Sequence, residues 1–201
     1  EREYINSANM KNWAIPQATH EWVMILDADE RITPELADAI RAALAEPQAE
    51  AFTVRRRSFV FGHAIRFCGW QSDVLVRLFR RDTCKYDDRR VHASVIVPSG
   101  SVKALGGDLL HYTYRDFHQF MAKLDRYTTW SAQDLFDRGR RATAMRLLCK
   151  PIARFLKQYV LQQGFRDGVA GLLLCGLSAT SVFLRYAKLW AMWHKGSAPA
   201  A

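Results

Sequence analysis

The segment at residues 21–30, Glu-Trp-Val-Met-Ile-Leu-Asp-Ala-Asp-Glu, constrains the fold of this chain more than any other. Residues 22–26 form an unbroken apolar run, which predicts a strand buried on both faces of a mostly parallel sheet. The run ends in two carboxylates, Asp27 and Asp29. Because ligands of open α/β sheets bind just outside the carboxyl ends of the strands, both side chains are expected at a binding edge. The pattern therefore predicts an α/β fold with a ligand site at this edge.

Two carboxylates at the end of a strand can hold a hard divalent cation, Mg²⁺ or Mn²⁺, through their oxygen atoms. A cation held by Asp27 and Asp29 would keep positions open for phosphate oxygens. It would also neutralise the charge that builds on a departing diphosphate. The same spacing occurs where carboxylates cap helices or fill turns, so the pair by itself leaves a structural role open.

The residues on either side of this pair carry a more specific signal. Residues 11–22 read Lys-Asn-Trp-Ala-Ile-Pro-Gln-Ala-Thr-His-Glu-Trp, and residues 31–36 read Arg-Ile-Thr-Pro-Glu-Leu. With Leu-Asp-Ala-Asp-Glu-Arg between them, they resemble the central part of a family 2 glycosyltransferase with the GT-A fold. Within that family the chain is most similar to the small lipopolysaccharide-core β-glucosyltransferases. The resemblance implies a Rossmann-like nucleotide-sugar-binding sheet.

The resemblance also implies residues for the donor nucleotide sugar. It places Lys11 and Asn12 near the nucleotide, with Asp27 and Asp29 at the diphosphate. A solvated lysine and a helix-surface amide are the alternatives for the first two residues. His111 follows the last predicted strand, where many GT-A enzymes have a histidine that completes the metal shell. The resemblance therefore implies His111 as a third metal ligand beside the two aspartates, with a purely structural histidine as the alternative.

A second matching segment, residues 69–81, reads Gly-Trp-Gln-Ser-Asp-Val-Leu-Val-Arg-Leu-Phe-Arg-Arg. It resembles the part of the family in which an acid precedes a strand ending Arg-Leu-Phe-Arg-Arg. The resemblance implies Asp73 as the general base and Arg77 as a donor contact. An inverting transfer needs one carboxylate within hydrogen-bond reach of the attacking hydroxyl, and Asp73 would supply it. Capping of the turn before the strand is the alternative role for Asp73.

Residues 86–93, Tyr-Asp-Asp-Arg-Arg-Val-His-Ala, depart from the family. An acid is expected after the Val-His pair, where this chain has Ala93. Asp87 and Asp88 lie close by in the sequence and are alternative bases. The departure leaves open which of the three acids takes the proton.

Periodicity and capping residues predict the remaining elements. A helix is expected over residues 3–19, bending or ending at Pro16, and a second helix is expected to begin after the N-cap Thr33 and end before Pro47. Alternation predicts strands over 51–61, 95–98 and 101–110. The arginine run at 55–57 either faces phosphates or lies on the surface, since alternate strand residues point to opposite faces.

The C-terminal third has a different character. Before Arg138, 18 basic residues oppose 19 acidic ones, whereas 11 basic residues and only Asp167 follow from there on. Helical spacing from Asp116 onward separates apolar from basic residues, the pattern of a helix lying in a membrane interface. The 17 uncharged residues at 168–184 are at the short limit for crossing a bilayer. We therefore expect peripheral attachment to an anionic membrane surface; docking on the protein's own core and a solvated basic face are the alternatives.

Composition sets the remaining limits. The chain has 201 residues, 49% of them hydrophobic, enough for one core. Its four scattered cysteines predict reduced thiols in a cytosolic protein, and no signal peptide is expected. The expected organisation is part of a GT-A catalytic domain at 1–115, a helical membrane-association region at 116–195 and a disordered tail at 196–201. By resemblance the chain starts inside the nucleotide-binding half, so this fragment alone is expected to be inactive.

These observations predict a glycosyltransferase of bacterial cell-envelope biosynthesis. It would move a hexose, with inversion, from a nucleotide sugar to a lipid-linked or lipopolysaccharide-core saccharide. The expected location is the cytoplasmic face of the inner membrane, and no nucleic acid partner is expected. Two other classes stay open: a phosphotransferase that uses an aspartyl phosphate, and a non-enzymatic basic module that binds membrane or nucleic acid.

Overall fold

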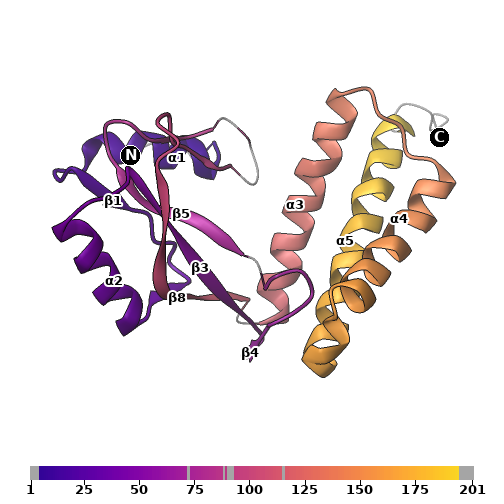
Figure 1. Cartoon of the computed structure of the whole chain (residues 1–201). Helices are drawn as coiled ribbons and strands as arrows, with labels where there is room; N and C mark the ends of the chain where they lie inside the picture. The colour runs from indigo at the N-terminus through magenta and orange to yellow at the C-terminus, as the bar shows by residue number, and fades with distance from the viewer. Residues whose placement is uncertain (1–4, 72, 88, 90–92, 115, 195–201) are drawn as a thin grey trace. The chain divides into compact units, whose positions relative to one another are not determined.

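The computed structural model describes residues 5–71, 73–87, 89, 93–114 and 116–194 (Figure 1). The chain forms two compact units. Unit 1 comprises Glu1–Arg57 and Ser72–His111 and holds most of the sheet, and unit 2 comprises Ser58–Gln71 and Tyr112–Ala201 and holds the C-terminal helices. Ser58–Gln71 thus belongs with the helices, although the predicted limit at residue 115 groups it with the catalytic part. The tail predicted at 196–201 lies outside the described residues.

Six strands of the described chain form one sheet in the order β1-β5-β3-β8-β2, with β4 beside β3. Two further strands form a separate ribbon. The strands of the sheet are β1 (Trp22–Met24), β2 (Glu30–Ile32), β3 (Ala51–Val60), β4 (His63–Ala64), β5 (Val74–Arg80) and β8 (Val102–Tyr114). The ribbon consists of β6 (Lys85–Tyr86) and β7 (Val95–Ile96). Together with the helices, these strands make a mixed α/β chain.

The sequence predicts a mostly parallel sheet around the apolar run. This prediction is wrong for β5, the described strand that pairs with β1. β1 pairs antiparallel with β5, with Trp22 opposite Arg80. The pairs β3–β5, β3–β4 and β2–β8 are antiparallel as well. All three residues of β1 are half-buried, because β1 stands at one end of the strand order and has a single described neighbour. An apolar run reports burial, and it carries no information on the direction of the adjacent strand.

Two helices cover the sheet of unit 1. α1 (Ser7–Ala14) is shorter than the predicted helix at 3–19, and a 3₁₀ turn, η1 (Ile15–Gln17), follows it and contains Pro16. α2 (Pro34–Ala45) begins as predicted, since the Thr33 hydroxyl accepts a hydrogen bond from the Leu36 N–H at 3.3 Å. The start of α2 follows from local capping rules, because Thr33 is a good N-cap and Pro34 suits the first helical position.

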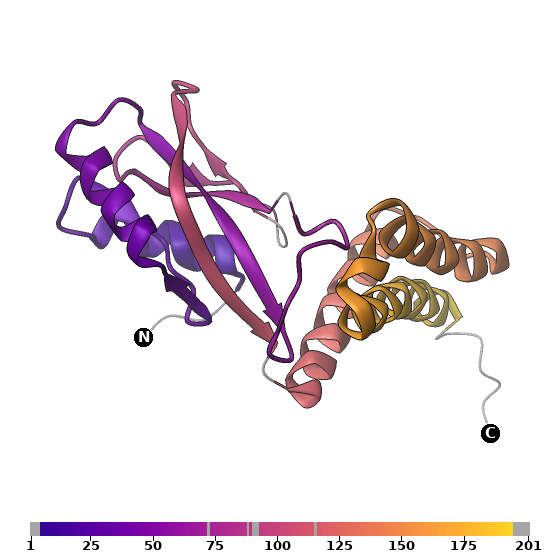
Figure 2. The same cartoon turned by 60° about the horizontal axis from the view of Figure 1, so that its bottom comes forward.

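Alternation along the strands divides the core of unit 1 between these helices. Phe79 packs with Ala8 and Ile15 of the α1 segment. The next residue toward the N-terminus, Leu78, points to the other face, where α2 residues pack. Leu36 of α2 is fully buried against strand residues on that face. Figure 2 shows α2 lying along the sheet.

Three helices and two turns make up most of unit 2. They are α3 (Phe117–Asp137), α4 (Ala144–Leu156), the π-turn η2 (Lys157–Leu161), the 3₁₀ turn η3 (Gly164–Asp167) and α5 (Gly168–His194). The predicted cap Asp116 is confirmed, because its carboxylate accepts the Gln119 N–H at 2.7 Å. α5 packs against both α3 and α4 (Figures 1 and 2).

The segment Ser58–Gln71 is tied to the helices by Asp167. The carboxylate of Asp167 accepts the backbone N–H groups of Arg66 and Phe67 at 2.9–3.2 Å. Ile65 and Cys68 pack against Leu174 and Cys175 of α5. These contacts explain why the segment belongs to unit 2.

Candidate active site

The end of β1 and the start of β2 are joined by a tight turn that contains both aspartates. The Glu30 N–H donates to the Asp27 carbonyl at 2.9 Å, and the Asp27 N–H donates to the Glu30 carboxylate at 3.0 Å. Asp29 lies within this turn. The two hydrogen bonds fix the backbone, so both aspartates are held at the carboxyl end of β1 as predicted.

Arg77 of β5 lies at the centre of the site. Its guanidinium donates to Asp27 Oδ2 at 2.9 Å and also contacts the Glu30 carboxylate. The side chain of Glu30 is fully buried, and that of Arg77 is 5% exposed. Arg77 therefore serves as an internal counter-ion for two acids, a role that the donor-contact prediction did not include.

Asp27 lies between two cations. Lys11 Nζ is 3.0 Å from Asp27 Oδ1, while Arg77 occupies Oδ2. Burial opposes ionisation of Asp27, but the charges of Arg77 and Lys11 outweigh it and lower the pKa of this carboxyl. Asp27 is therefore ionised at neutral pH.

Arg56 of β3 extends the ion pairs to the predicted base. Its Nε donates to Asp73 Oδ2 at 2.8 Å, and its Nη1 lies 3.5 Å from Glu30 Oε1. The result is one ion-pair network: Lys11, Asp27, Arg77, Glu30, Arg56 and Asp73. The network joins the predicted base Asp73 to three of the predicted donor contacts, Lys11, Asp27 and Arg77. It also includes Glu30 and Arg56, which were not predicted as site residues.

The arginine run at 55–57 is divided by strand alternation. Arg56 joins the network, whereas Arg55 and Arg57 pair with Asp108 of β8 at 2.5 and 2.6 Å. Asp108 is buried, and the two arginines pair with its carboxylate oxygens Oδ1 and Oδ2. One arginine of the run thus belongs to the site and two serve the sheet.

His111 lies next to the aspartate turn. It is opposite Glu30 in the β2–β8 ladder, and its Nε2 is 3.5 Å from Asp29 Oδ2. Among the described residues, no three His, Cys, Asp or Glu side chains gather closely enough to hold a metal alone. Asp29 and His111 fit two positions of a Mg²⁺ or Mn²⁺ shell, whose remaining ligands can be phosphate oxygens and water. Both oxygens of Asp27 are engaged by Arg77 and Lys11.

Asn12 holds the β6 strand. Its amide donates to the Tyr86 carbonyl at 2.9 Å and accepts the Tyr86 N–H at 2.8 Å. Asn12 thus joins α1 to β6, and its approach to the nucleotide stays a prediction. Tyr86 itself is buried beneath Lys11, whose Nζ is 5.3 Å from the ring centre. Burial raises the pKa of Tyr86 against the opposing charge of Arg77.

Of the two alternative bases, Asp87 lies among the described residues. Asp87 pairs with Arg89 at 2.8 Å. Although burial opposes its ionisation, hydrogen bonds from the Arg89 and Ser94 backbone and the Arg89 charge lower its pKa. Asp88 lies outside the described residues. Ala93, which stands where an acid was expected, packs against the apolar cluster that contains Tyr86.

Glu30, Arg56 and Tyr86 are the site residues that sequence reasoning missed. The sequence does carry a signal for Glu30, because it directly follows the two aspartates. A third acid at this place needs a counter-ion if it is buried. No sequence signal pointed to Tyr86, whose position depends on the β6–β7 ribbon. A buried tyrosine beside Lys11 and Arg77 limits the water that reaches the network.

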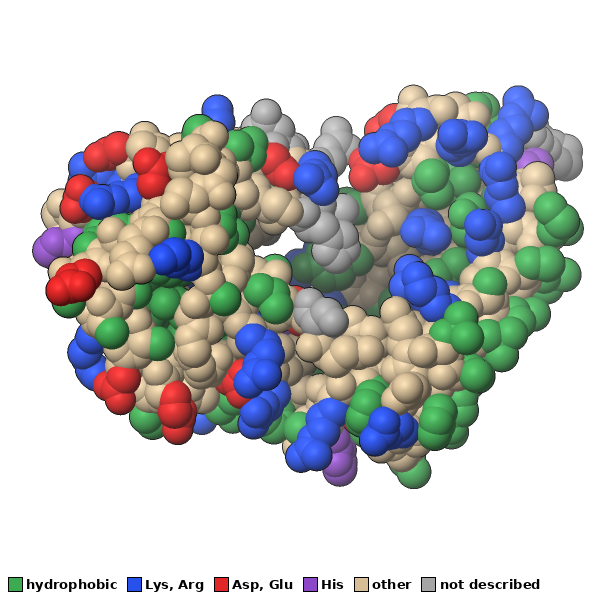
Figure 3. Space-filling view, in the orientation of Figure 1, with side chains coloured by type: hydrophobic (Ala, Val, Ile, Leu, Met, Phe, Trp, Pro, Cys, Tyr) green, Lys and Arg blue, Asp and Glu red, His purple; other side chains and the backbone are tan. Residues whose placement is uncertain are grey.

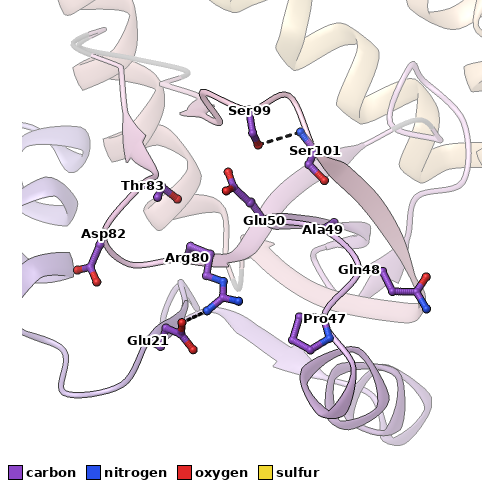
Figure 4. Close-up of a pocket in the computed structure, with 10 residues that line it drawn as sticks. All are labelled: Glu21, Pro47, Gln48, Ala49, Glu50, Arg80, Asp82, Thr83, Ser99 and Ser101. Atoms are coloured by element: carbon purple, nitrogen blue, oxygen red, sulfur yellow. Dashed lines mark hydrogen bonds and ion pairs between the residues drawn. The ribbon is translucent and has the colours of Figure 1, made fainter.

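A pocket of about 560 Å³ lies at the opposite end of β1 (Figure 4). Glu21, which precedes β1, forms an ion pair with Arg80 at the end of β5 on its wall. Ser99, Ser101 and Glu50 also line it. Because the Asp27 turn follows the other end of β1, this pocket is separate from the ion-pair network.

Relatives of known name match most of the chain, although no protein-family model matches it. The lipopolysaccharide core biosynthesis glycosyltransferase LpsC of Rhizobium meliloti (strain 1021) is 29% identical over 186 residues, covering 91% of this chain and 68% of LpsC. The uncharacterized glycosyltransferases RT0209 of Rickettsia typhi and RP128 of Rickettsia prowazekii are each 24% identical over 203 residues, covering 94% of this chain and 68% of theirs. These relatives support the assignment of this chain as a glycosyltransferase.

Proposed function

We propose that this protein is an inverting family 2 glycosyltransferase of GT-A fold, which moves a hexose from a nucleotide sugar to a lipid-linked or lipopolysaccharide-core acceptor. The observation that carries the proposal is the ion-pair network, which joins the Asp27–Asp29 turn to Asp73 through Arg77, Glu30 and Arg56. Glycosyl transfer needs the carboxylates at the donor and at the acceptor to be held at a fixed separation. A network of ion pairs between them holds that separation. The name of LpsC supports the class of acceptor.

Asp29 and His111 are the residues that would hold Mg²⁺ or Mn²⁺, which would neutralise the leaving nucleoside diphosphate. Lys11 adds a cation next to this edge, 20% exposed and anchored on Asp27. Its charge favours binding of the donor diphosphate. Arg77 is buried and paired, so it keeps Asp27 ionised and in place.

Asp73 is the proposed general base. Arg56 holds its carboxylate through two nitrogen atoms, each 2.8 Å from Oδ2, while the side chain stays 22% exposed. In the reaction the acceptor oxygen forms a bond to the anomeric carbon as the bond to the diphosphate oxygen breaks. The hydroxyl proton passes to Asp73, and the leaving nucleoside diphosphate keeps the bonding electron pair. Arg56 orients the base, which favours the attack in line with the departing group.

The two other function classes have less support. A phosphotransferase of the aspartyl-phosphate type would use Asp27 as a nucleophile, yet both of its oxygens are engaged by cations. A non-enzymatic basic module gives no role to the network in unit 1.

The test is a panel of nucleotide sugars incubated with Mn²⁺ or Mg²⁺ and the purified protein, extended to the full length of relatives such as LpsC because the fragment alone is expected to be inactive. Release of nucleoside diphosphate is measured with and without a lipopolysaccharide-core acceptor, and the anomeric configuration of the product is read by NMR. The proposal expects one donor to be consumed with inversion. Retention of configuration, or hydrolysis of an acyl or phosphoryl substrate instead, would refute it.

A further inference from the structure

An apolar face without a protein partner runs along α4. None of its described residues is fully buried. Four large apolar residues at helical spacing, Met145, Leu148, Ile152 and Leu156, are 51–71% exposed. Leu147 and Phe155, on another side, are half-buried. A soluble helix normally buries its apolar stripe, so this face calls for an external partner.

α5 has a second exposed apolar face. Val169, Leu172, Leu173, Phe183 and Trp190 are 44–74% exposed, and they recur at helical spacing. The opposite side of α5 holds the buried residues Leu174, Cys175, Val182 and Leu189. No Asp, Glu, Lys or Arg of α5 shares the exposed face, because Arg185 and Lys188 are displaced from it by roughly a third of a turn or more. α5 therefore has one face that is buried in the protein and one apolar face that is exposed.

The two exposed faces lie on the same side of unit 2. A groove of about 310 Å³ is lined by Leu148 and Ile152 from α4 and by Thr180 and Phe183 from α5. Since these residues belong to the exposed stripes, the stripes border one groove and form one surface. Leu161 and Phe165, 77% and 53% exposed, extend it through the turns between the helices. We name this surface, from Met145 to Trp190, the α4–α5 apolar face.

The apolar stripe of α4 is accompanied by a basic side of the same helix. Arg146, Lys150, Arg154 and Lys157 lie on the side of α4 away from its apolar stripe, at helical spacing. Within unit 2, Figure 3 shows green side chains along one edge with blue ones beside them. Only one acid, Asp167, follows Arg138 in the sequence, and its carboxylate accepts backbone hydrogen bonds from Arg66 and Phe67. The surroundings of the face are thus strongly cationic.

We infer that the α4–α5 apolar face inserts flat into the headgroup boundary of an anionic lipid monolayer, with the groove between the helices seating an acyl chain. Apolar side chains of both helices would enter the acyl region, while the long cationic side chains on the polar side of α4 would reach toward lipid phosphates. A second copy of the chain is the weaker occupant, because the chain carries 11 basic residues and one acid from Arg138 onward, and two copies would repel each other. The anionic cytoplasmic leaflet of the bacterial inner membrane matches this charge.

Flat insertion is favoured over crossing of the bilayer. Among the described residues, Gly164–His194 is long and apolar enough to cross a membrane, with 22% of its most apolar window buried. Its inner face, however, packs on α3 and α4. Lys188 Nζ is bound to Asp125, Thr128 and Thr129 of α3 at 2.7–2.9 Å. Crossing would carry these polar groups and the basic side of α4 into the bilayer or would break the helix contacts.

Cys149 gives a direct probe of this geometry. It is the exposed cysteine of the four and lies on α4 next to the apolar stripe, whereas Cys68, Cys84 and Cys175 are buried. The full chain is labelled at Cys149 with an environment-sensitive fluorophore and mixed with two kinds of vesicle, pure phosphatidylcholine and equal parts phosphatidylcholine and phosphatidylglycerol. Co-sedimentation measures binding, and the emission shift reports whether the label enters the bilayer.

We expect binding to the anionic vesicles with a blue shift. The double variant Leu148→Gln/Ile152→Gln should lose the shift and lower the partition coefficient more than about tenfold. The control Val74→Gln/Ile96→Gln changes two apolar residues of unit 1 that are 51% and 44% exposed, and it should bind like the parent. Circular dichroism of each variant reports that the helices remain.

Three results would overturn the inference. One is equal partition of the Leu148/Ile152 variant and the parent when both are folded. Another is full retention of the protein in carbonate-washed vesicles together with protease protection of α5, which indicates a span. The third is a vesicle-independent dimer that the Leu148/Ile152 variant converts to monomer, which would assign the face to a second copy. None of these measurements uses glycosyl transfer, so the inference and the proposed function are tested separately.

Discussion

Arg77 and Glu30 form a buried ion pair that connects β5 to the start of β2, although 46 residues separate them in the sequence. Each partner also binds a second charged residue: Arg77 binds Asp27, and Arg56 lies by Glu30. Because the side chains of Arg77 and Glu30 are 5% and 0% exposed, solvent cannot take the place of either partner. The pair therefore sets both the stability of unit 1 and the distance between Asp27 and Asp73.

The first prediction concerns this pair. Glu30→Met should lower the free energy of unfolding by about 3–5 kcal/mol, because it leaves Arg77 buried without a full counter-charge. The double variant Glu30→Met/Arg77→Met should cost less than the sum of the single changes, since it removes both buried charges. Urea unfolding of the four proteins measures the coupling. Additive costs would show that the two charges do not depend on each other. Glu35→Met, at an exposed position of α2, is the control.

The second prediction concerns acid pH. The pKa of Asp27 is lowered in the folded protein from its ordinary value of 3.8. A group with a depressed folded pKa contributes stability above its unfolded pKa and loses it as the pH falls through the folded pKa. Asp27→Asn should therefore flatten the loss of stability below about pH 4. Thermal unfolding between neutral and acid pH measures this slope. A slope equal to that of the parent protein would contradict the described pairing of Asp27.

The third prediction concerns the metal edge. Asp29→Ala and His111→Ala should each weaken Mn²⁺-dependent binding of a nucleoside diphosphate by more than about tenfold, since each removes a proposed ligand. Calorimetry with and without Mn²⁺ measures the effect. Asp82→Ala removes an exposed acid at the opposite end of β1 and should leave the affinity unchanged. Equal affinity in all three variants would exclude the metal assignment.

The fourth prediction separates the candidate bases. Asp73→Asn should lower kcat by about 10²–10⁴-fold with little change in the donor KM, because a general base accepts the hydroxyl proton in the transition state and does not hold the donor. Asp87→Asn should have a much smaller effect, since its lowered pKa makes it a weaker base. Steady-state kinetics with a saturating acceptor measures both. If Asp87→Asn or Asp88→Asn abolishes turnover and Asp73→Asn does not, the base lies in residues 86–93.

The fifth prediction concerns Gly107, which has a φ of +81°. A Cβ at this position would lie 2.4 Å from the backbone nitrogen of Leu36, at the start of α2. Gly107→Ala should lower the free energy of unfolding by more than about 1 kcal/mol, since both the backbone angle and the neighbour oppose it. Gly106→Ala, where nothing lies within 4 Å of the added carbon, is the matched control. Equal stability of the two variants would contradict the described packing of β8 on α2.

Local signals in the sequence determined several features correctly. Thr33 and Asp116 cap α2 and α3 because each needs only a backbone N–H three residues away. The position of Asp27 and Asp29 at the end of a strand follows from the apolar run that precedes them. The separation of basic from apolar residues in α4 follows from helical spacing alone.

The tertiary structure decided what depends on partners far away in the chain. The two hydrogen bonds of the Asn12 amide are made with the backbone of Tyr86, 74 residues later in the chain. The arginines at 55–57 are alike in sequence, but Arg56 meets Glu30 and Asp73 while its neighbours meet Asp108. The direction of the strand beside β1 was not encoded in its apolar run. That α4 and α5 expose their apolar stripes on one side depends on how the helices pack, because hydrophobic periodicity gives the width of a stripe and leaves its direction in the folded protein undetermined.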